Sequence, residues 1–406
     1  MRIMDSVIYY NDCIAPFIVP DPAVVNWSMI PLDEWRCEPQ LIKDIMLMIV
    51  SQHKAIRGQR DLDRDLEVCQ QRNNTIQALN KQLSNVSTQI TDVALDAVMM
   101  LLTADIQYSA MGSCIEVMGG TTSNAQLLSQ SINWPRELAE NFPDWDAIAV
   151  TACFPCPATL FHAISRINDL RASLFRQTSS SALTNTFSSL SLQSPHEDTI
   201  DEIRSILKQI KAFSASKWLP AVIKTLDFEF EPTSPDWLAL THCYHAATLL
   251  YCLRTLVFES PLRHHDEFDE ALSSLLEDLF GTSVGEAVRV GALRALFTHL
   301  GFPLLMLAGK GLSAHSSAWN AVMWPLFISG YEAGGDGLGA EEMRGMREFV
   351  VGKTKELAML LGTRSVVDAQ VILEKCWERR EKGGGEGLDG GWTWDETFTK
   401  RCVFII

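Results

Sequence analysis

The sequence lacks any long apolar segment. Its richest apolar run, FPLLMLAG at residues 302–309, is far shorter than the roughly 18 or more residues that a membrane-spanning helix needs. The N-terminal stretch is interrupted by Asp5, Asn11 and Asp12, so it also lacks the continuous apolar core of a secretion signal. We therefore predict a soluble cytoplasmic protein that does not contact a membrane.

Positive charge is also scarce. The 406 residues include 34 Lys and Arg against 50 Asp and Glu, which gives a formal net charge of -16. No dense run of Lys and Arg offsets this balance locally. Because such a chain repels a phosphate backbone, we expect no direct binding of nucleic acid.

Motifs of common catalytic sites are missing. The chain contains no G-x-S-x-G, no H-E-x-x-H and no dinucleotide fingerprint, and its glycine-rich stretches at 330–339 and 383–391 lack the Lys-Ser/Thr ending of a phosphate loop. Ten cysteines are present, but Cys153 and Cys156 form the only Cys-x2-Cys pair. We accordingly expect neither a cofactor nor a metal site.

Helical periodicity dominates what is present. In residues 62–83 apolar side chains recur at steps of three, four and seven, and no alternating strand pattern with hairpin turns occurs anywhere in the chain. This pattern predicts an all-α fold, one large helical bundle that spans residues 1–406. Residues 177–195 and 383–391 are expected to be flexible loops. The predicted helices cover 62–83, 88–108, 158–176, 198–213, 234–258, 265–280, 285–300, 316–331, 341–360 and 364–380.

Three segments resemble the fungal-specific transcription-factor regulatory domain. They are IYYNDCIAPFIVPDP at 8–22, WPLFISGYEA at 324–333, and the stretch 346–406 that includes GTRSVVDAQVILEKCWERR and ends in GWTWDETFTKRCVFII. The resemblance implies an all-helical regulatory-type domain. Family members normally carry a zinc cluster built from two Cys-x2-Cys pairs ahead of it. No such cluster occurs in this sequence, so we expect no DNA-binding domain within residues 1–406.

Relatives of this kind without a zinc cluster occur in fungal secondary-metabolite gene clusters, and some of them resemble hetero-Diels–Alderases. That resemblance implies a cofactor-independent pericyclase that joins a quinone methide, derived from a tropolone or polyketide, to a humulene-type terpene. Such an enzyme would act by holding two apolar substrates in a reactive geometry, which is worth roughly 7–11 kcal/mol. The alternative is a transcriptional regulator or ligand-sensing domain, located in the nucleus. Under either function the chain could form a homodimer.

The segment 234–258 carries most of the candidate site. His242, His245 and Tyr244 lie on or beside one stripe of a helix that should begin at Pro235. They are the predicted proton donors of catalysis. The alternative, which the apolar surroundings favour, is that both histidines are core residues that bond to main chain or to a neighbouring helix. Further along this helix, two predicted substrate-binding residues follow, of which the arginine needs a carboxylate partner if it is buried: Tyr251 and Arg254.

A second apolar helix, 315–331, supplies the remaining candidates. Asn320 follows a tryptophan on an apolar helix and must find hydrogen-bond partners, so it is a predicted catalytic donor. Trp319, Trp324 and Tyr331 are predicted to bind substrate, although Trp324 could simply pack the bundle. Outside these helices, His299 is expected at the surface.

Overall fold

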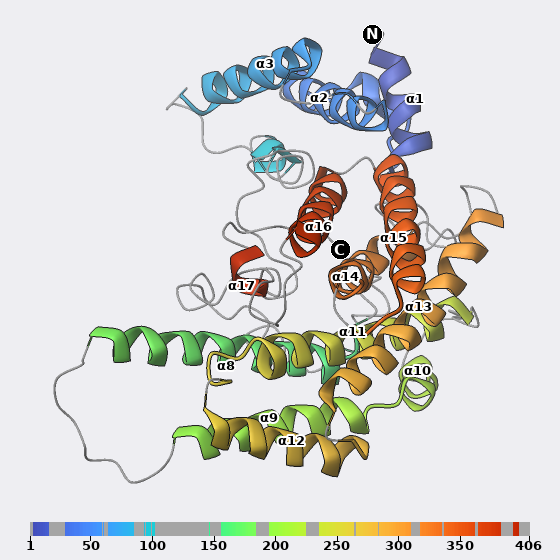
Figure 1. The fold of residues 1–406 in the computed structure, drawn as a ribbon. Coiled ribbons are helices and arrows are strands. Elements are labelled where there is room, and N and C mark those ends of the chain that lie inside the picture. The colour runs from blue at the N-terminus through green and yellow to red at the C-terminus, as the bar shows by residue number, and fades with distance from the viewer. Residues whose placement is uncertain are drawn as a thin grey trace.

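The computed structural model describes the parts of the chain that follow: residues 3–15, 29–58, 60, 64–84, 93, 95–98, 100–101, 146, 156–183, 195–224, 235–263, 265–282, 284–309, 317–334, 337–361, 364–382 and 393–397. Within these ranges the regular elements are helices, and no strand occurs. Figure 1 shows the helices packed across one another, with α1 to α3 at one end and α9 and α12 at the other. The predicted all-α fold is confirmed.

The N-terminal helices form a small apolar end of the molecule. They are α1 (Ile3–Cys13), the 3-10 turn η2 (Glu34–Arg36), α2 (Gln40–Arg57) and α3 (Leu66–Leu83). The Asp65 carboxylate accepts the main-chain N–H groups of Glu67 and Val68, 3.0 and 3.2 Å away. This cap fixes the start of α3 four residues later than the periodicity predicts. The end is joined to the rest of the bundle where α2 packs on α15.

The central helices surround α11. They are α8 (Ala158–Leu183), α9 (Pro195–Ala212), α10 (Ala215–Ile223), α11 (Pro235–Cys252), the π-helix η3 (Leu253–Phe258), α12 (Asp266–Phe280) and α13 (Gly285–Gly309). Helix α11 begins at Pro235, as predicted. It is apolar around its whole circumference, which is typical of a fully buried helix, and it packs on α8, α9, α10, α13 and α14.

The C-terminal helices complete the bundle. They are α14 (Ser317–Glu332), α15 (Ala340–Leu361), α16 (Arg364–Lys382) and the single turn α17 (Trp394–Thr397). Helix α14 packs on α11, α13, α15 and α16, so it lies between the central and the C-terminal helices. None of the described helices combines the length and the apolar character that crossing a membrane requires.

Several element predictions need correction. The loop predicted for 177–195 is wrong at its start, because α8 continues to Leu183: residues 177–183 contain neither Gly nor Pro to end a helix. Pro195 instead occupies the first position of α9. Helices α1, α2, α10 and α17 were not among the predicted ranges. The predicted loop 383–391 lies outside the described residues. So does most of the predicted helix 88–108.

Candidate functional site

The His245 side chain forms a hydrogen bond to the main chain of a neighbouring helix. Its Nε2–H donates to the carbonyl oxygen of Ile210 on α9 at 2.8 Å, and its ring meets Phe213 edge-on at 5.4 Å. Burial lowers the pKa of His245, although the Ile210 carbonyl opposes this shift. A neutral imidazole that donates one proton to a neighbouring helix is the core arrangement left open by the sequence.

His242 lies against a second histidine. The rings of His242 and His299 stack with centroids 4.5 Å apart and planes 10° from parallel, and both residues are half-buried. Burial lowers the pKa of each imidazole. The expectation that His299 lies at the surface is met only in part, because its half-buried ring stacks on His242 between α11 and α13.

Three predicted residues gather in an aromatic group. Tyr244 stacks on Trp324 with ring centroids 5.7 Å apart, and Tyr251 meets Trp324 edge-on at 6.3 Å. All three side chains are fully buried, and burial raises the pKa of Tyr244. Among the described residues the Trp324 indole N–H has no hydrogen-bond partner. The packing of Trp324 matches the core interpretation that the sequence offered for it.

A charged cluster lies where α11 passes into the π-helix η3. Arg254 donates from Nε and Nη2 to the two carboxylate oxygens of Glu332, each at 2.7 Å. Arg289 donates to the same carboxylate at 2.8 Å. Burial would raise the pKa of Glu332, but the two guanidinium groups lower it to about 2. The expected carboxylate partner of Arg254 is thus found, on the last residue of α14.

Glu259 lies at the edge of this charged cluster. One carboxylate oxygen is 3.5 Å from both Arg254 Nη1 and the Tyr331 hydroxyl, and the other accepts the main-chain N–H of Trp394 at 2.5 Å. Burial raises the pKa of Glu259 to about 7, against the opposing charge of Arg254. π-helical segments often occur at functional positions, and here the segment aims Arg254 at α14 and Glu259 at α17.

The single turn α17 closes the same region from the C-terminal side. The indole of Trp394 meets the rings of Tyr331, Tyr251 and Phe327 edge-on, with centroids 4.9, 5.3 and 6.3 Å away. We call these three rings the Trp394 socket. Next to the socket, the Arg171 guanidinium donates to Asp395 at 2.7 Å and to the Tyr251 hydroxyl.

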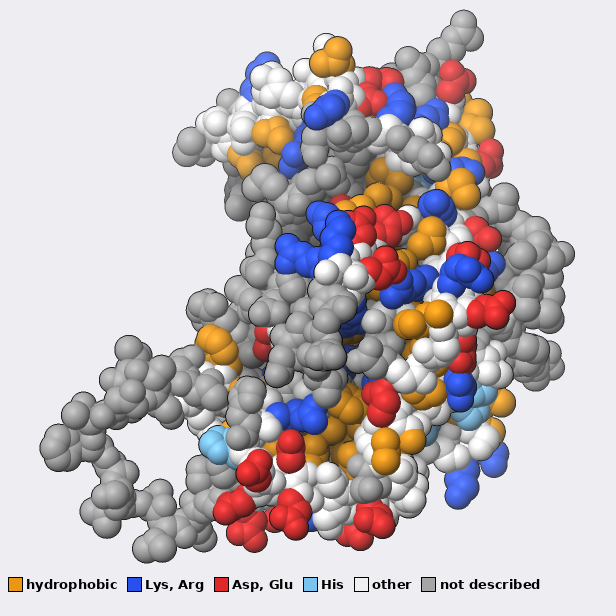
Figure 2. Space-filling model, in the orientation of Figure 1, with side chains coloured by type: hydrophobic (Ala, Val, Ile, Leu, Met, Phe, Trp, Pro, Cys, Tyr) orange, Lys and Arg blue, Asp and Glu red, His pale blue; other side chains and the backbone are white. Residues whose placement is uncertain are grey.

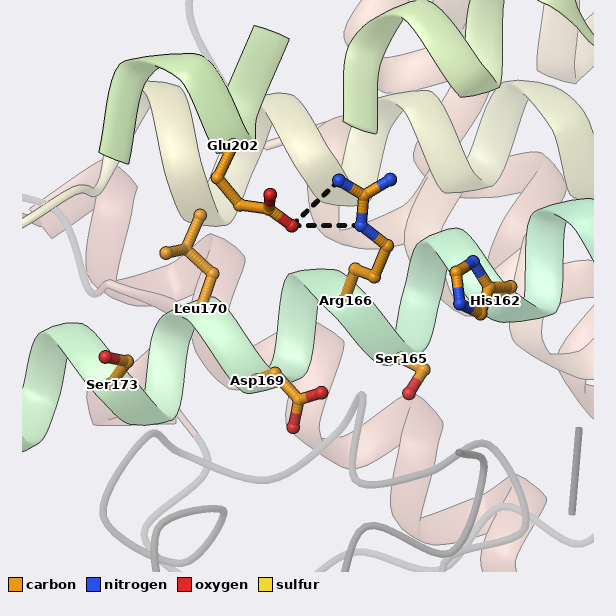
Figure 3. A pocket seen from close by; sticks show the side chains of 7 residues that line it. All are labelled: His162, Ser165, Arg166, Asp169, Leu170, Ser173 and Glu202. Atoms are coloured by element: carbon orange, nitrogen blue, oxygen red, sulfur yellow. Dashed lines mark hydrogen bonds and ion pairs between the residues drawn. The ribbon is translucent and has the colours of Figure 1, made fainter. Parts of the chain in front are cut away.

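A surface pocket of about 460 Å³ lies along α8 (Figure 3). Arg166 and Glu202 form a charged pair in its lining, 2.9 Å apart, and Arg166 also donates to Gln209 and Ser205. Such a polar lining suits a hydrogen-bonding ligand rather than a terpene, and no predicted site residue contributes to it. It is lined by His162, Ser165, Arg166, Asp169, Leu170, Ser173 and Glu202.

The remaining predictions are only partly visible. Trp319 and Asn320 belong to the first turn of α14, but their side chains lie outside the described residues, as does Cys153. In the described ranges no three His, Cys, Asp or Glu side chains are grouped as metal ligands. The structure therefore brings together Tyr244, Tyr251 and Trp324, while the two predicted catalytic histidines face other neighbours.

Sequence reasoning missed the partners that organise this region. Glu332 stands at the end of the WPLFISGYEA motif, where an acid that closes an otherwise apolar helix could have been recognised as the partner of Arg254. Arg171 gave no comparable signal. Trp394 and Asp395 belong to the segment GWTWDETFTKRCVFII that carries the family resemblance, but their partners on distant helices could not be read from it.

Comparison with known proteins places these residues in a family. The profile of the fungal specific transcription factor domain matches residues 113–403. Over 440 aligned positions the chain is 23% identical to the phomenoic acid biosynthesis cluster-specific transcriptional regulator of Leptosphaeria maculans, and the alignment covers 100% of this chain and 74% of that protein. No solved structure matches the chain.

Proposed function

This chain belongs to the fungal specific transcription factor domain family, and on that premise we propose that it regulates the transcription of a biosynthetic gene cluster. The observation that carries the proposal is the similarity of the whole chain to a regulator of this kind. A regulatory role would place the protein in the nucleus.

We propose further that the domain acts by binding proteins or small ligands and does not bind DNA directly. Figure 2 shows Asp and Glu side chains gathered over the end of the molecule formed by α9 and α12. On α9 they are Glu197, Asp198, Asp201 and Glu202, and on α12 they include Asp266, Glu267 and Glu270. A surface of this charge repels DNA phosphates, which favours contacts with proteins or small ligands.

The pericyclase function predicted from the sequence finds no support in either comparison, whereas the regulatory alternative does. The described donors also point in different directions: His245 is bonded to Ile210, and His242 is stacked on His299. Catalysis of a hetero-Diels–Alder reaction by these residues stays a prediction, and homodimer formation stays one too.

A fusion experiment tests the proposal. The full chain is joined to an unrelated DNA-binding module, and transcription of a reporter gene with the matching operator is measured against the module alone. We expect the fusion to change reporter output severalfold. A second fusion carries Glu332→Gln, which removes the carboxylate shared by Arg254 and Arg289, and we expect it to lose the effect. Equal output from the intact fusion and the bare module, at equal protein levels, would overturn the proposal.

A further inference from the structure

The pocket along α8 has two edges that run beside the helix. On α8 its lining residues recur at steps of three and four, so they form one stripe of the helix. This stripe extends about 16 Å along the helix axis, and the pocket volume is about 460 Å³, so the pocket accommodates an elongated small molecule. Figure 3 shows the two edges on opposite sides of α8, one formed by Ser165, Asp169 and Ser173 and the other by Arg166, Leu170 and Glu202.

Glu202 keeps one carboxylate oxygen for a ligand. Arg166 donates from Nε at 2.9 Å and from Nη2 at 2.8 Å, and both bonds fall on the Oε1 atom of Glu202. The Oε2 atom takes no part in this ion pair, and the side chain is 42% exposed. A carboxylate oxygen only accepts hydrogen bonds, and a charged donor gives it the strongest ones. An ammonium group is therefore a fitting partner for Oε2.

His162 presents a hydrogen-bond donor at one end of the pocket. The Nη1 atom of Arg166 donates to the side-chain oxygen of Gln209 at 2.8 Å, and because a guanidinium only donates, this contact fixes the orientation of the amide. The Gln209 NH2 group then donates to the Thr159 carbonyl at 2.8 Å and to His162 Nδ1 at 3.4 Å. A neutral His162 imidazole whose Nδ1 accepts must carry its proton on Nε2. This N–H can donate to an oxygen of a ligand.

The charges of the lining favour a cation. Asp169 and Glu202 contribute two carboxylates, and Arg166 contributes one guanidinium that is paired with Glu202. A concave surface with an excess of negative charge attracts cations. Ser165 and Ser173 add hydroxyl groups, which both donate and accept hydrogen bonds. The pocket therefore suits a ligand that combines an ammonium group with several hydroxyl groups.

We propose that the α8 pocket binds small polyhydroxylated amines, the chemical class to which amino sugars belong. The ammonium group of the ligand donates to Glu202 Oε2, and one of its oxygens accepts the Nε2–H of His162. Its other hydroxyl groups bond to the serine hydroxyls and to Asp169, whose carboxylate can accept several hydrogen bonds. The site does not depend on the proposed regulatory function, because binding is measured on the purified chain.

Calorimetric titration of the full chain tests the proposal. One probe is the β-linked disaccharide of glucosamine, and the other is the same disaccharide with both nitrogens acetylated, which keeps the hydroxyl groups but has no charge. We expect the amine form to bind at least about tenfold more tightly, as the loss of one charged hydrogen bond implies. Equal binding of the two forms, or binding of neither, would overturn the proposal.

Glu202→Gln separates a bond at this pocket from general attraction to an acidic chain. The introduced amide still turns its oxygen toward the donors of Arg166, so its NH2 group replaces Oε2 and opposes an ammonium group. We expect this variant to lose the preference for the amine form. The matched control is Glu342→Gln, which removes the same charge from a side chain that is 34% exposed.

The control differs from Glu202 in one respect. Arg294 occupies both carboxylate oxygens of Glu342, at 2.8 and 2.9 Å. We therefore expect Glu342→Gln to bind both probes as the unaltered chain does. If the two variants lose the same affinity for the amine form, the attraction comes from net charge alone and the proposal fails.

His162→Phe covers the case in which Glu202→Gln does not fold. His162 is exposed, so the variant should keep the fold. Loss of one neutral hydrogen bond should weaken binding of the amine disaccharide roughly two- to tenfold. Cadaverine, which has ammonium groups but no hydroxyl group, should bind the variant and the unaltered chain alike. Unchanged affinity of the variant for the amine disaccharide would overturn the proposal, as would an equal loss of affinity for cadaverine.

Discussion

The middle of α11 and its C-terminal end, with the π-helix that follows, bury polar groups by different means. In the middle, the His245 imidazole donates to the Ile210 carbonyl, and the His242 ring stacks on that of His299. At its end, in the π-helix, Arg254 is buried with full charge and meets a carboxylate through two bonds. The first arrangement could be replaced by apolar packing at little cost, whereas the second loses far more when one partner is removed.

This difference also sets how far each region reaches through the chain. The histidines in the middle of α11 contact the neighbouring helices α9 and α13. The C-terminal end and the π-helix bring together Arg171, Glu332 and Asp395 from three distant segments. The charged end therefore joins the C-terminal helices to the centre, and we expect it to dominate stability.

Glu332→Gln should have the largest effect. It leaves Arg254 and Arg289 without their shared carboxylate in a buried site, so we expect the free energy of unfolding in urea to fall by about 3–5 kcal/mol. Glu342→Gln is the matched control, because Glu342 pairs with the exposed Arg294, and such pairs contribute about 0–1 kcal/mol. Similar losses in both variants would show that the buried cluster contributes no more to stability than an exposed ion pair does.

Glu259→Gln should change the pH dependence at the same end. Burial raises the pKa of Glu259 from 4.5 to about 7, so the folded state holds a proton that the unfolded state releases. The stability that this proton supplies is present below pH 4.5 and is lost as the pH rises to about 7, by about 3 kcal/mol. The variant should lack this loss when unfolding is measured from pH 4.5 to 7.5. An unchanged pH profile would contradict the raised pKa.

Tyr251→Phe should cost less, and His245→Leu less again. The Tyr251 hydroxyl accepts from Arg171 and donates to Asn168 at 2.7 Å, so its removal should lower the free energy of unfolding by about 1–3 kcal/mol. His245 makes one bond to main chain, for which about 0.5–1.5 kcal/mol is expected. The reverse order in denaturant titrations would contradict the contrast between the middle of α11 and its C-terminal end.

The smallest effect is expected at the histidine pair. Burial lowers the pKa values of His242 and His299, so protonation favours the unfolded state as the pH falls below 6.5, the reverse of the trend at Glu259. His242→Phe should reduce the loss of stability between pH 7 and pH 5, as followed by thermal unfolding. A steeper loss in the variant would contradict this account.

Local patterns predicted the helices well and the tertiary partners poorly. Pro235 marked the start of α11, and Arg254 in an apolar run signalled a buried carboxylate, because both features act within a few residues. Ser and Thr suggested a loop after residue 176, but the absence of Gly and Pro let α8 continue to Leu183. The meeting of Arg171 with Asp395, 224 positions apart, is set by packing and leaves no local trace.

The most direct test of the central claim uses the gene in its natural host. Transcripts of the genes that lie next to it are quantified in a strain that lacks this gene and in a strain where it is restored. A regulator predicts that these transcripts change severalfold together on deletion and return on restoration. Unchanged transcripts, together with an accumulated intermediate that the purified chain converts to product, would contradict regulation and support the enzyme.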